Sequence, residues 1–76
     1  MNAVQLKMAR VALGLTVRQA AEAADVSHDT ITRLEASQAV KPSTVQKVRA
    51  ALEAAGVEFI AENGGGPGVR LRKRER

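Results

Sequence analysis

Helix-start signals are the feature of this sequence that most constrains its fold. Thr16 is followed three residues later by Gln19, and Ser27 precedes another short helical stretch. In a capping box, the Thr N-cap side chain accepts from the backbone N–H of the third helical residue, and the Gln side chain at that third position accepts from the N-cap N–H. A Ser N-cap alone makes the first of these two bonds. These signals predict one short helix over 17–24 and a second over 28–36.

A further helix is predicted before this pair. Asn2 and Gln5 cap a helix over 3–13, and Gly14 suits the left-handed cap at its end. The apolar residues expected on its inward face are Leu6, Ala9 and Leu13, and those expected to widen that face are Val4, Met8 and Val11.

A fourth helix is predicted after the pair. Ser43 and Gln46 form another capping box behind Pro42, which opens a helix that runs to Ala55 and stops at Gly56. Its apolar stripe consists of Val45, Val48 and Leu52. Four short helices with fitting starts and stops predict a mainly α fold.

The end of the chain changes character. Residues 57–61 are rich in β-branched and aromatic side chains, residues 63–68 form a turn-like glycine-rich segment, and residues 69–72 alternate apolar and basic. This pattern predicts a β-hairpin appended to the helices. Because a lone two-stranded hairpin is marginal in water, we expect it to need a partner surface, such as a second subunit.

The formal charge of +4 is unevenly distributed. Residues 1–69 carry seven basic and seven acidic side chains, so the whole excess falls in residues 70–76. A basic end of this kind either contacts nucleic acid phosphates or is a solvated terminus that aids solubility. Charge alone does not choose between the two.

Several classes of protein are disfavoured. The chain has no cysteine and one histidine, which leaves no disulfide framework, no thiol chemistry and no expected metal or cofactor site. The glycine run leads into a strand rather than opening a helix, unlike a phosphate-binding loop. We therefore expect no enzyme activity, no membrane span and no signal peptide, and a cytoplasmic protein.

The two central helices point to DNA. Small residues, Ala20 and Ala21, allow the first to cross the second closely, and an α-helix fits the width of the major groove. Here the sequence resembles the Xre/Cro/C1 family of bacterial and phage repressors, from Ala9 to Val57. The matching elements are Arg10-x-x-x-Gly14-Leu15-Thr16, Gln19-Ala20-Ala21, Val26-Ser27-x-x-Thr30-Ile31-x-x-Leu34-Glu35, Pro42-Ser43 and Leu52-x-x-x-Gly56-Val57.

The resemblance implies a lambda-repressor-like helix-turn-helix fold that binds double-stranded DNA, usually as a dimer. Two departures are visible. Asp25 stands where the family usually has Gly in the turn, and a left-handed backbone there is tolerable for Asp. A strand pair also replaces the family's usual fifth helix, which leaves the dimer mode open.

The resemblance places four side chains of the second central helix toward the base edges: His28, Asp29, Thr32 and Arg33. Arg33 can bond guanine, and Asp29 can accept from a cytosine amino group. Each has a plainer alternative. Asp29 also suits the helix N-terminus as a charge, His28 can be an exposed polar residue near a cap, and Arg33 can form a surface ion pair.

Other residues are assigned to phosphates and to the fold. The expected phosphate contacts lie at the starts of the two central helices and in the loop that follows them: Thr16, Arg18, Gln19, Ser27, Ser37, Gln38 and Lys41. In the resembled family, Arg10 and Glu35 form an ion pair. Arg10 also falls on the inward face of its helix, where a charge requires a partner.

The domain organisation follows from these assignments. Residues 1–56 are the expected DNA-binding domain, residues 57–73 a strand segment for dimerisation, and residues 74–76 a basic tail. The expected dimer contacts are Val57, Phe59, Ile60, Val69 and Leu71. The function indicated is a transcriptional regulator, in particular an autoregulatory repressor, and an activator would use the same DNA-reading surface. The alternative is an antitoxin-type protein that binds a partner protein and represses its own promoter.

Overall fold

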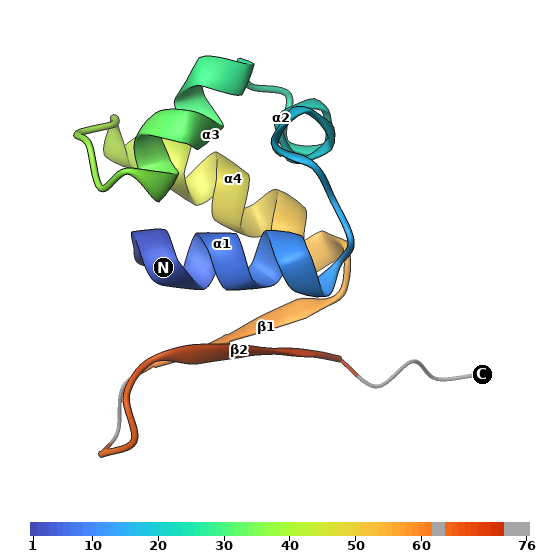
Figure 1. The fold of residues 1–76 in the computed structure, drawn as a ribbon, viewed down its shortest axis with the longest axis vertical. Helices are drawn as coiled ribbons and strands as arrows, with labels where there is room; N and C mark the ends of the chain where they lie inside the picture. Colours follow the sequence, from blue (N-terminus) through green and yellow to red (C-terminus); the bar gives the residue numbers. More distant parts are fainter. Residues whose placement is uncertain (62–63, 73–76) are drawn as a thin grey trace.

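The computed structural model describes residues 1–61 and 64–72. Within this range, four helices are followed by one two-stranded antiparallel sheet (Figure 1). The elements are α1 (Ala3–Ala12), α2 (Val17–Ala24), α3 (His28–Glu35), α4 (Pro42–Ala54), β1 (Val57–Ile60) and β2 (Gly68–Leu71). The predicted fold, mainly helical with a C-terminal hairpin, is confirmed. The predicted tail at 74–76, together with Lys73, lies outside the described residues.

Most of the predicted helix starts are confirmed. Asn2 with Gln5 and Thr16 with Gln19 form complete capping boxes, and the Ser27 hydroxyl accepts from the backbone N–H of Thr30 at 3.1 Å. Each cap satisfies backbone amides that have no partner inside the helix.

The predicted capping box of Ser43 and Gln46 is wrong. The fourth helix begins two residues earlier, with Pro42 as its first residue and Lys41 as an N-cap that makes no side-chain hydrogen bond. Proline favours this position because its fixed φ suits the first helical turn and it has no N–H to leave unpaired. The ring therefore starts α4 without help from a capping side chain.

The core joins all four helices to the first strand. Its largest fully buried side chains are Leu6, Ile31, Val48, Leu52 and Val57, and the small residues Ala20, Ala21 and Ala24 let α2 approach closely. No helix of the described residues is long and apolar enough to cross a lipid bilayer.

The outer face of α1 differs from the expectation. Val4 and Val11 are 65% and 62% exposed, and Met8 is 36% exposed, so these residues do not widen the buried face. Leu6 and Ala9 already fill the inward side of the helix. Since Val4, Met8 and Val11 lie on a different side of the same short helix, they face solvent.

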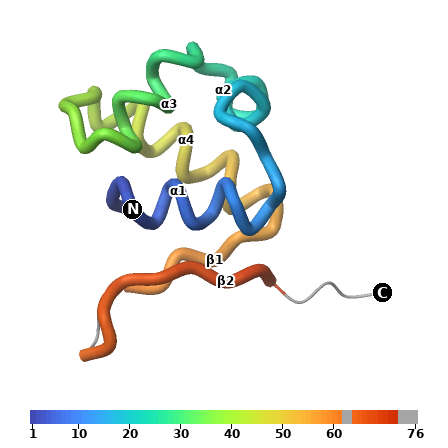
Figure 2. The backbone as a smooth tube through the Cα atoms, viewed as in Figure 1, coloured from blue at the N-terminus to red at the C-terminus, as the bar shows by residue number. Residues whose placement is uncertain are grey.

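The hairpin packs on its own chain. Figure 2 shows it across α1 from α3, and β2 contacts α1 while β1 contacts α4. The Gln5 side chain, which is buried, donates from Nε2 to the carbonyl oxygens of Ile60 and Gly68, both at 3.0 Å. The surface that the hairpin needs is therefore supplied in part by α1 and α4.

This packing corrects one predicted dimer contact. Val57 is 1% exposed and belongs to the core of its own chain, so it has no surface to offer a partner. Phe59 and Val69, which face each other across the ladder, are partly buried against the same core. Ile60 and Leu71 remain exposed.

Candidate nucleic-acid interface

Helices α2 and α3 form a unit with a tight turn between them. Asp25 adopts the left-handed conformation, with φ of 55°, as expected from the sequence. The N–H of Val26 then donates to the carbonyl of Ala21 at 3.0 Å, which closes the end of α2. Ile31 of α3 packs with the alanines of α2 in the core. The crossing of the two helices is thus fixed by a short turn and by small side chains.

Lys47 of α4 holds the turn from outside. Its ammonium donates to the Asp25 carbonyl at 3.0 Å and lies 3.6 Å from the carboxylate of the same residue. Sequence reasoning missed this contact, since a single exposed lysine on α4 gives no signal of its partner. The contact ties the α2–α3 turn to the rest of the domain.

The four predicted base-reading residues come together on the exposed side of α3. His28, Asp29, Thr32 and Arg33 are all solvent-exposed. The Thr32 hydroxyl donates to the His28 carbonyl at 3.2 Å, so its methyl group is the part left for apolar contact. This cluster presents donors, an acceptor and a methyl group within two turns of one helix.

Arg33 and Asp29 are paired in the structure. The Nε of Arg33 donates to Oδ2 of Asp29 at 2.8 Å, and both side chains are largely exposed. This is the surface ion pair weighed in the sequence. It engages one edge of the guanidinium and leaves the two terminal nitrogens, which form a fork suited to two acceptors on one base.

The predicted phosphate-binding residues flank α3 at both ends. Thr16, Arg18 and Gln19 are exposed at the start of α2, where Thr16 and Gln19 are already engaged in the capping box. Ser27 likewise caps α3, and its hydroxyl lies 2.9 Å from that of Thr30. The remaining three, all exposed, lie in the loop after α3: Ser37, Gln38 and Lys41.

The loop after α3 contains a second left-handed residue. Ser37 has φ of 60°, and the N–H of Gln38 donates to the Arg33 carbonyl at 2.9 Å. This arrangement ends α3 in the way that a glycine usually does. It was not predicted, because serine is not typical of that position.

An ion pair joins α3 to α1. Arg10 donates from Nε and Nη2 to the carboxylate of Glu35, at 2.6 Å and 3.2 Å, and from Nη1 to the Leu15 carbonyl at 2.9 Å. The two side chains are only 15% and 14% exposed. The hydrogen bonds that Arg10 donates to Glu35, together with the negative charge of that carboxylate, raise the pKa of Arg10 above its ordinary value, against the opposing effect of burial. The pair therefore anchors the C-terminal end of α3 rather than offering a charge to a ligand.

The described residues contain no group of three or more side chains able to hold a metal ion. A family model described as a helix-turn-helix domain matches residues 3–59, which include all four helices and most of β1. A comparison with curated proteins found no match.

Proposed function

Since this chain belongs to the helix-turn-helix domain family, we propose that it is a sequence-specific regulator of transcription that reads DNA as a dimer. In such domains the second helix of the motif enters the major groove, and its N-terminal residues contact base edges. The observation that carries the proposal is the exposed polar cluster of His28, Asp29, Thr32 and Arg33 on α3, the second helix of the pair. Domains of this family are DNA-binding modules rather than enzymes.

Arg33 is the principal base reader in this proposal. Its free terminal nitrogens match the O6 and N7 acceptors of guanine, while Asp29 holds the other edge of the guanidinium at 2.8 Å. Preorganising a long side chain lowers the entropy lost on binding. The second carboxylate oxygen of Asp29 remains able to accept from a cytosine amino group. Thr32 offers a methyl group to thymine, and His28 offers a donor to a base or a phosphate.

The residues around α3 fix the register on the phosphate backbone. Arg18 and Lys41 supply charge, and amides at the start of α2 supply neutral donors. Hydroxyl and amide groups from Thr16, Gln19, Ser27, Ser37 and Gln38 complete this set. Such contacts give affinity without sequence information, and they make binding salt-dependent.

The regulator is an Xre/Cro/C1-type repressor in this account. A dimer that occupies an operator blocks transcription by occupancy alone, so repression requires no surface beyond the one that binds DNA. Activation requires an additional contact with the transcription machinery. The protein's own upstream DNA is the expected operator. The antitoxin alternative requires a bound toxin as well, and no side-chain contact described above favours it.

Two substitutions test the division between base and phosphate contacts. Arg33→Ala should weaken binding to the operator by about 1–3 kcal/mol and relax the preference at one base pair. Arg18→Ala should weaken binding to all sequences about equally and lower the slope of log K against log salt by about one. The measurement is a fluorescence titration of operator and scrambled duplexes at several salt concentrations.

The two variants serve as controls for each other, because each replaces an exposed arginine with alanine on a neighbouring helix. Both should keep the far-UV circular dichroism of the wild type. If Arg33→Ala lowered affinity for operator and scrambled DNA by the same factor, α3 would not read bases through Arg33.

A further inference from the structure

Exposed apolar side chains are confined to one part of the molecule. Among the described residues, the large hydrophobic side chains that face solvent belong to α1 and the hairpin, and none belongs to α2, α3 or α4. They are Val4, Met8, Val11, Ile60 and Leu71. An apolar surface separate from the DNA-reading helix indicates a place for a protein contact.

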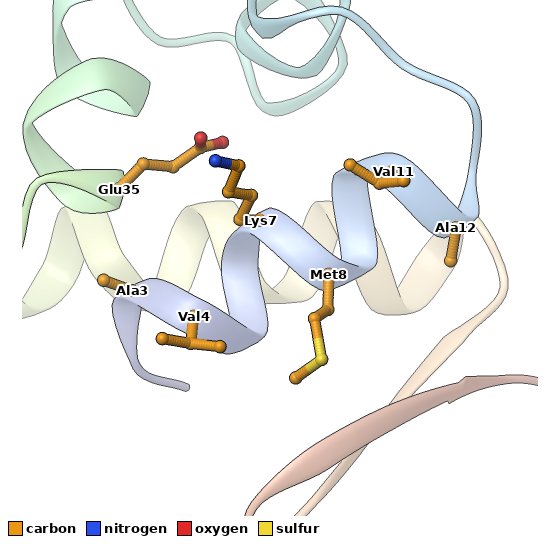
Figure 3. Close-up of a pocket in the computed structure, with 7 residues that line it drawn as sticks. All are labelled: Ala3, Val4, Lys7, Met8, Val11, Ala12 and Glu35. Atoms are coloured by element: carbon orange, nitrogen blue, oxygen red, sulfur yellow. The ribbon is translucent and has the colours of Figure 1, made fainter.

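The part of this surface on α1 is a continuous strip. Val4, Met8 and Val11 follow one another at helical spacing and line an open depression of about 490 Å³, with Ala3 and Ala12 at its two ends. Figure 3 shows Met8 extending from α1 toward the hairpin side. The small side chains at the ends allow another helix to approach closely along the strip.

The neighbouring edge of β2 is open. The backbone N–H of Arg72 donates to the Gly56 carbonyl at 2.7 Å. Along an antiparallel ladder, residue pairs that are hydrogen-bonded to each other alternate with pairs that are not. The peptide groups of Val69 and Leu71 must therefore point away from β1. No backbone hydrogen bond from another described element reaches them, and the Leu71 side chain is 53% exposed. An edge of this kind is a template for another strand.

We propose that a second copy of this chain docks on the outer strip of α1 and the open edge of β2. The inference rests on the proposed function, which requires two copies of α3, and it specifies the surface that joins them. Helix α1 and strand β2 lie beside each other and run in the same direction (Figures 1 and 2). A single two-fold axis normal to the sheet therefore places β2 beside β2 of the second copy and α1 beside α1 of the second copy, and each pair is antiparallel.

The strip is self-complementary under this operation. When its centre lies on the axis, Val4 meets Val11 of the second copy, and Ala3 meets Ala12 of the second copy. The charged residues that line the depression are one cation, Lys7, and one anion, Glu35. On the strands, Arg70 is neutralised by Glu58 at 2.7 Å. A balanced, mainly apolar face suits a copy of itself better than a nucleic acid or an acidic peptide.

The placement of α3 agrees with this arrangement. Helix α3 lies on the opposite side of α1 from the hairpin (Figure 1). An axis normal to the sheet leaves both copies of α3 on the same side of the dimer, which is what two half-sites on one face of a duplex require. The two hairpins become a four-stranded sheet on the side away from DNA.

The first test places a charge on the strip. Val11→Glu should raise the dimer Kd by about 100-fold, because it places a carboxylate in a contact formed mainly by apolar side chains. The matched control is Ala50→Glu, which adds the same charge at an exposed position of α4 and should leave the Kd unchanged. Sedimentation equilibrium gives the Kd, and circular dichroism checks that both variants remain helical.

A second test keeps the proposal falsifiable if Val11→Glu fails to fold. The chain contains no cysteine, so Val4→Cys and Val11→Cys introduce the only thiols. Seven residues apart on one helix, the two are too distant for an internal disulfide. On mild oxidation the double variant should form covalent dimers, and each single variant should form far fewer, because Val4 faces Val11 rather than itself.

The outcomes separate this proposal from the proposed function. A wild type that stays monomeric at high micromolar concentration would overturn it, and so would a Val11→Glu variant as dimeric as Ala50→Glu. Equal cross-linking of single and double variants would overturn the antiparallel register. A dimer that behaves as expected but prefers no DNA sequence would refute the proposed function and leave the docking surface intact.

Discussion

The α2–α3 unit and the α1–hairpin side of this small domain expose opposite kinds of surface. Around α3 the exposed groups are polar, and Asp29 and Arg33 are paired with each other. On α1 and the hairpin, the exposed groups include all five large hydrophobic side chains of the described residues that face solvent. DNA contact requires charge and hydrogen bonding, whereas stable self-association requires apolar area. The difference is the basis of our proposal that one short chain divides DNA binding and self-association between its two sides.

The largest effect is expected at the joint between the two regions. Arg10 of α1 and Glu35 of α3 form the ion pair that connects them, with both side chains mostly buried. Glu35→Ala should lower the free energy of unfolding by about 3 kcal/mol, because it leaves Arg10 poorly solvated and without its carboxylate. Urea denaturation followed by circular dichroism measures the change.

A conservative change sharpens this prediction. Glu35→Gln keeps one acceptor for Arg10 but removes the charge, so it should cost less than Glu35→Ala. Both variants should bind operator normally under conditions where they are folded. If Glu35→Ala kept the wild-type stability and lost DNA binding, Glu35 would belong to the DNA-contacting residues and not to the joint.

The next effect is expected within the α1–hairpin side. Gln5 donates to the carbonyl oxygens of Ile60 and Gly68 from a buried position. Gln5→Ala should cost about 1–3 kcal/mol, since two part-buried hydrogen bonds that tie α1 to the hairpin are lost. Amide hydrogen exchange should quicken in β1 and β2 more than in α3. Equal acceleration in all elements would mean that the two sides do not differ in local stability.

The smallest effect is expected within the DNA-reading side. Ser37 has a left-handed backbone, and a glycine carries no steric penalty there. Ser37→Gly should raise the free energy of unfolding by about 0.5–1 kcal/mol. Ser37→Ala is the matched control, because it removes the same hydroxyl but keeps the steric cost. If operator binding fell equally in both variants, the Ser37 hydroxyl would contact DNA as the sequence predicts.

The sequence predicted the helices that begin at a capping side chain close by in the chain. The boxes at Asn2 and Thr16 and the cap at Ser27 fixed three helix starts, because each depends only on residues three positions apart. The same reasoning failed at Ser43, where Pro42 supplied an earlier start that needs no capping side chain. A proline and a capping box next to each other predict different helix starts, and the sequence does not say which of the two prevails.

Features that depend on tertiary packing were not predictable in the same way. On α1 the sequence placed Leu6 and Ala9 correctly on the inward face, but it wrongly extended that face to Val4 and Val11, because only the fold decides how wide the buried face is. Gln5 was recognisable as a capping residue but not as the donor to the hairpin, since its partners lie 55 and 63 residues away. The exposed cluster on α3 was predictable by resemblance. A surface ion pair of Arg33 was an open alternative, but Asp29 was not foreseen as its partner.

Protection of the protein's own upstream DNA is the most direct test of the claim that α3 reads sequence. We expect a footprint over two half-sites about one helical turn apart, roughly 34 Å, at a salt concentration where a scrambled duplex is unprotected. In the Arg33→Ala variant, this footprint should require a higher protein concentration. Equal protection of the upstream and scrambled duplexes, or protection that Arg33→Ala leaves unchanged, would contradict the account.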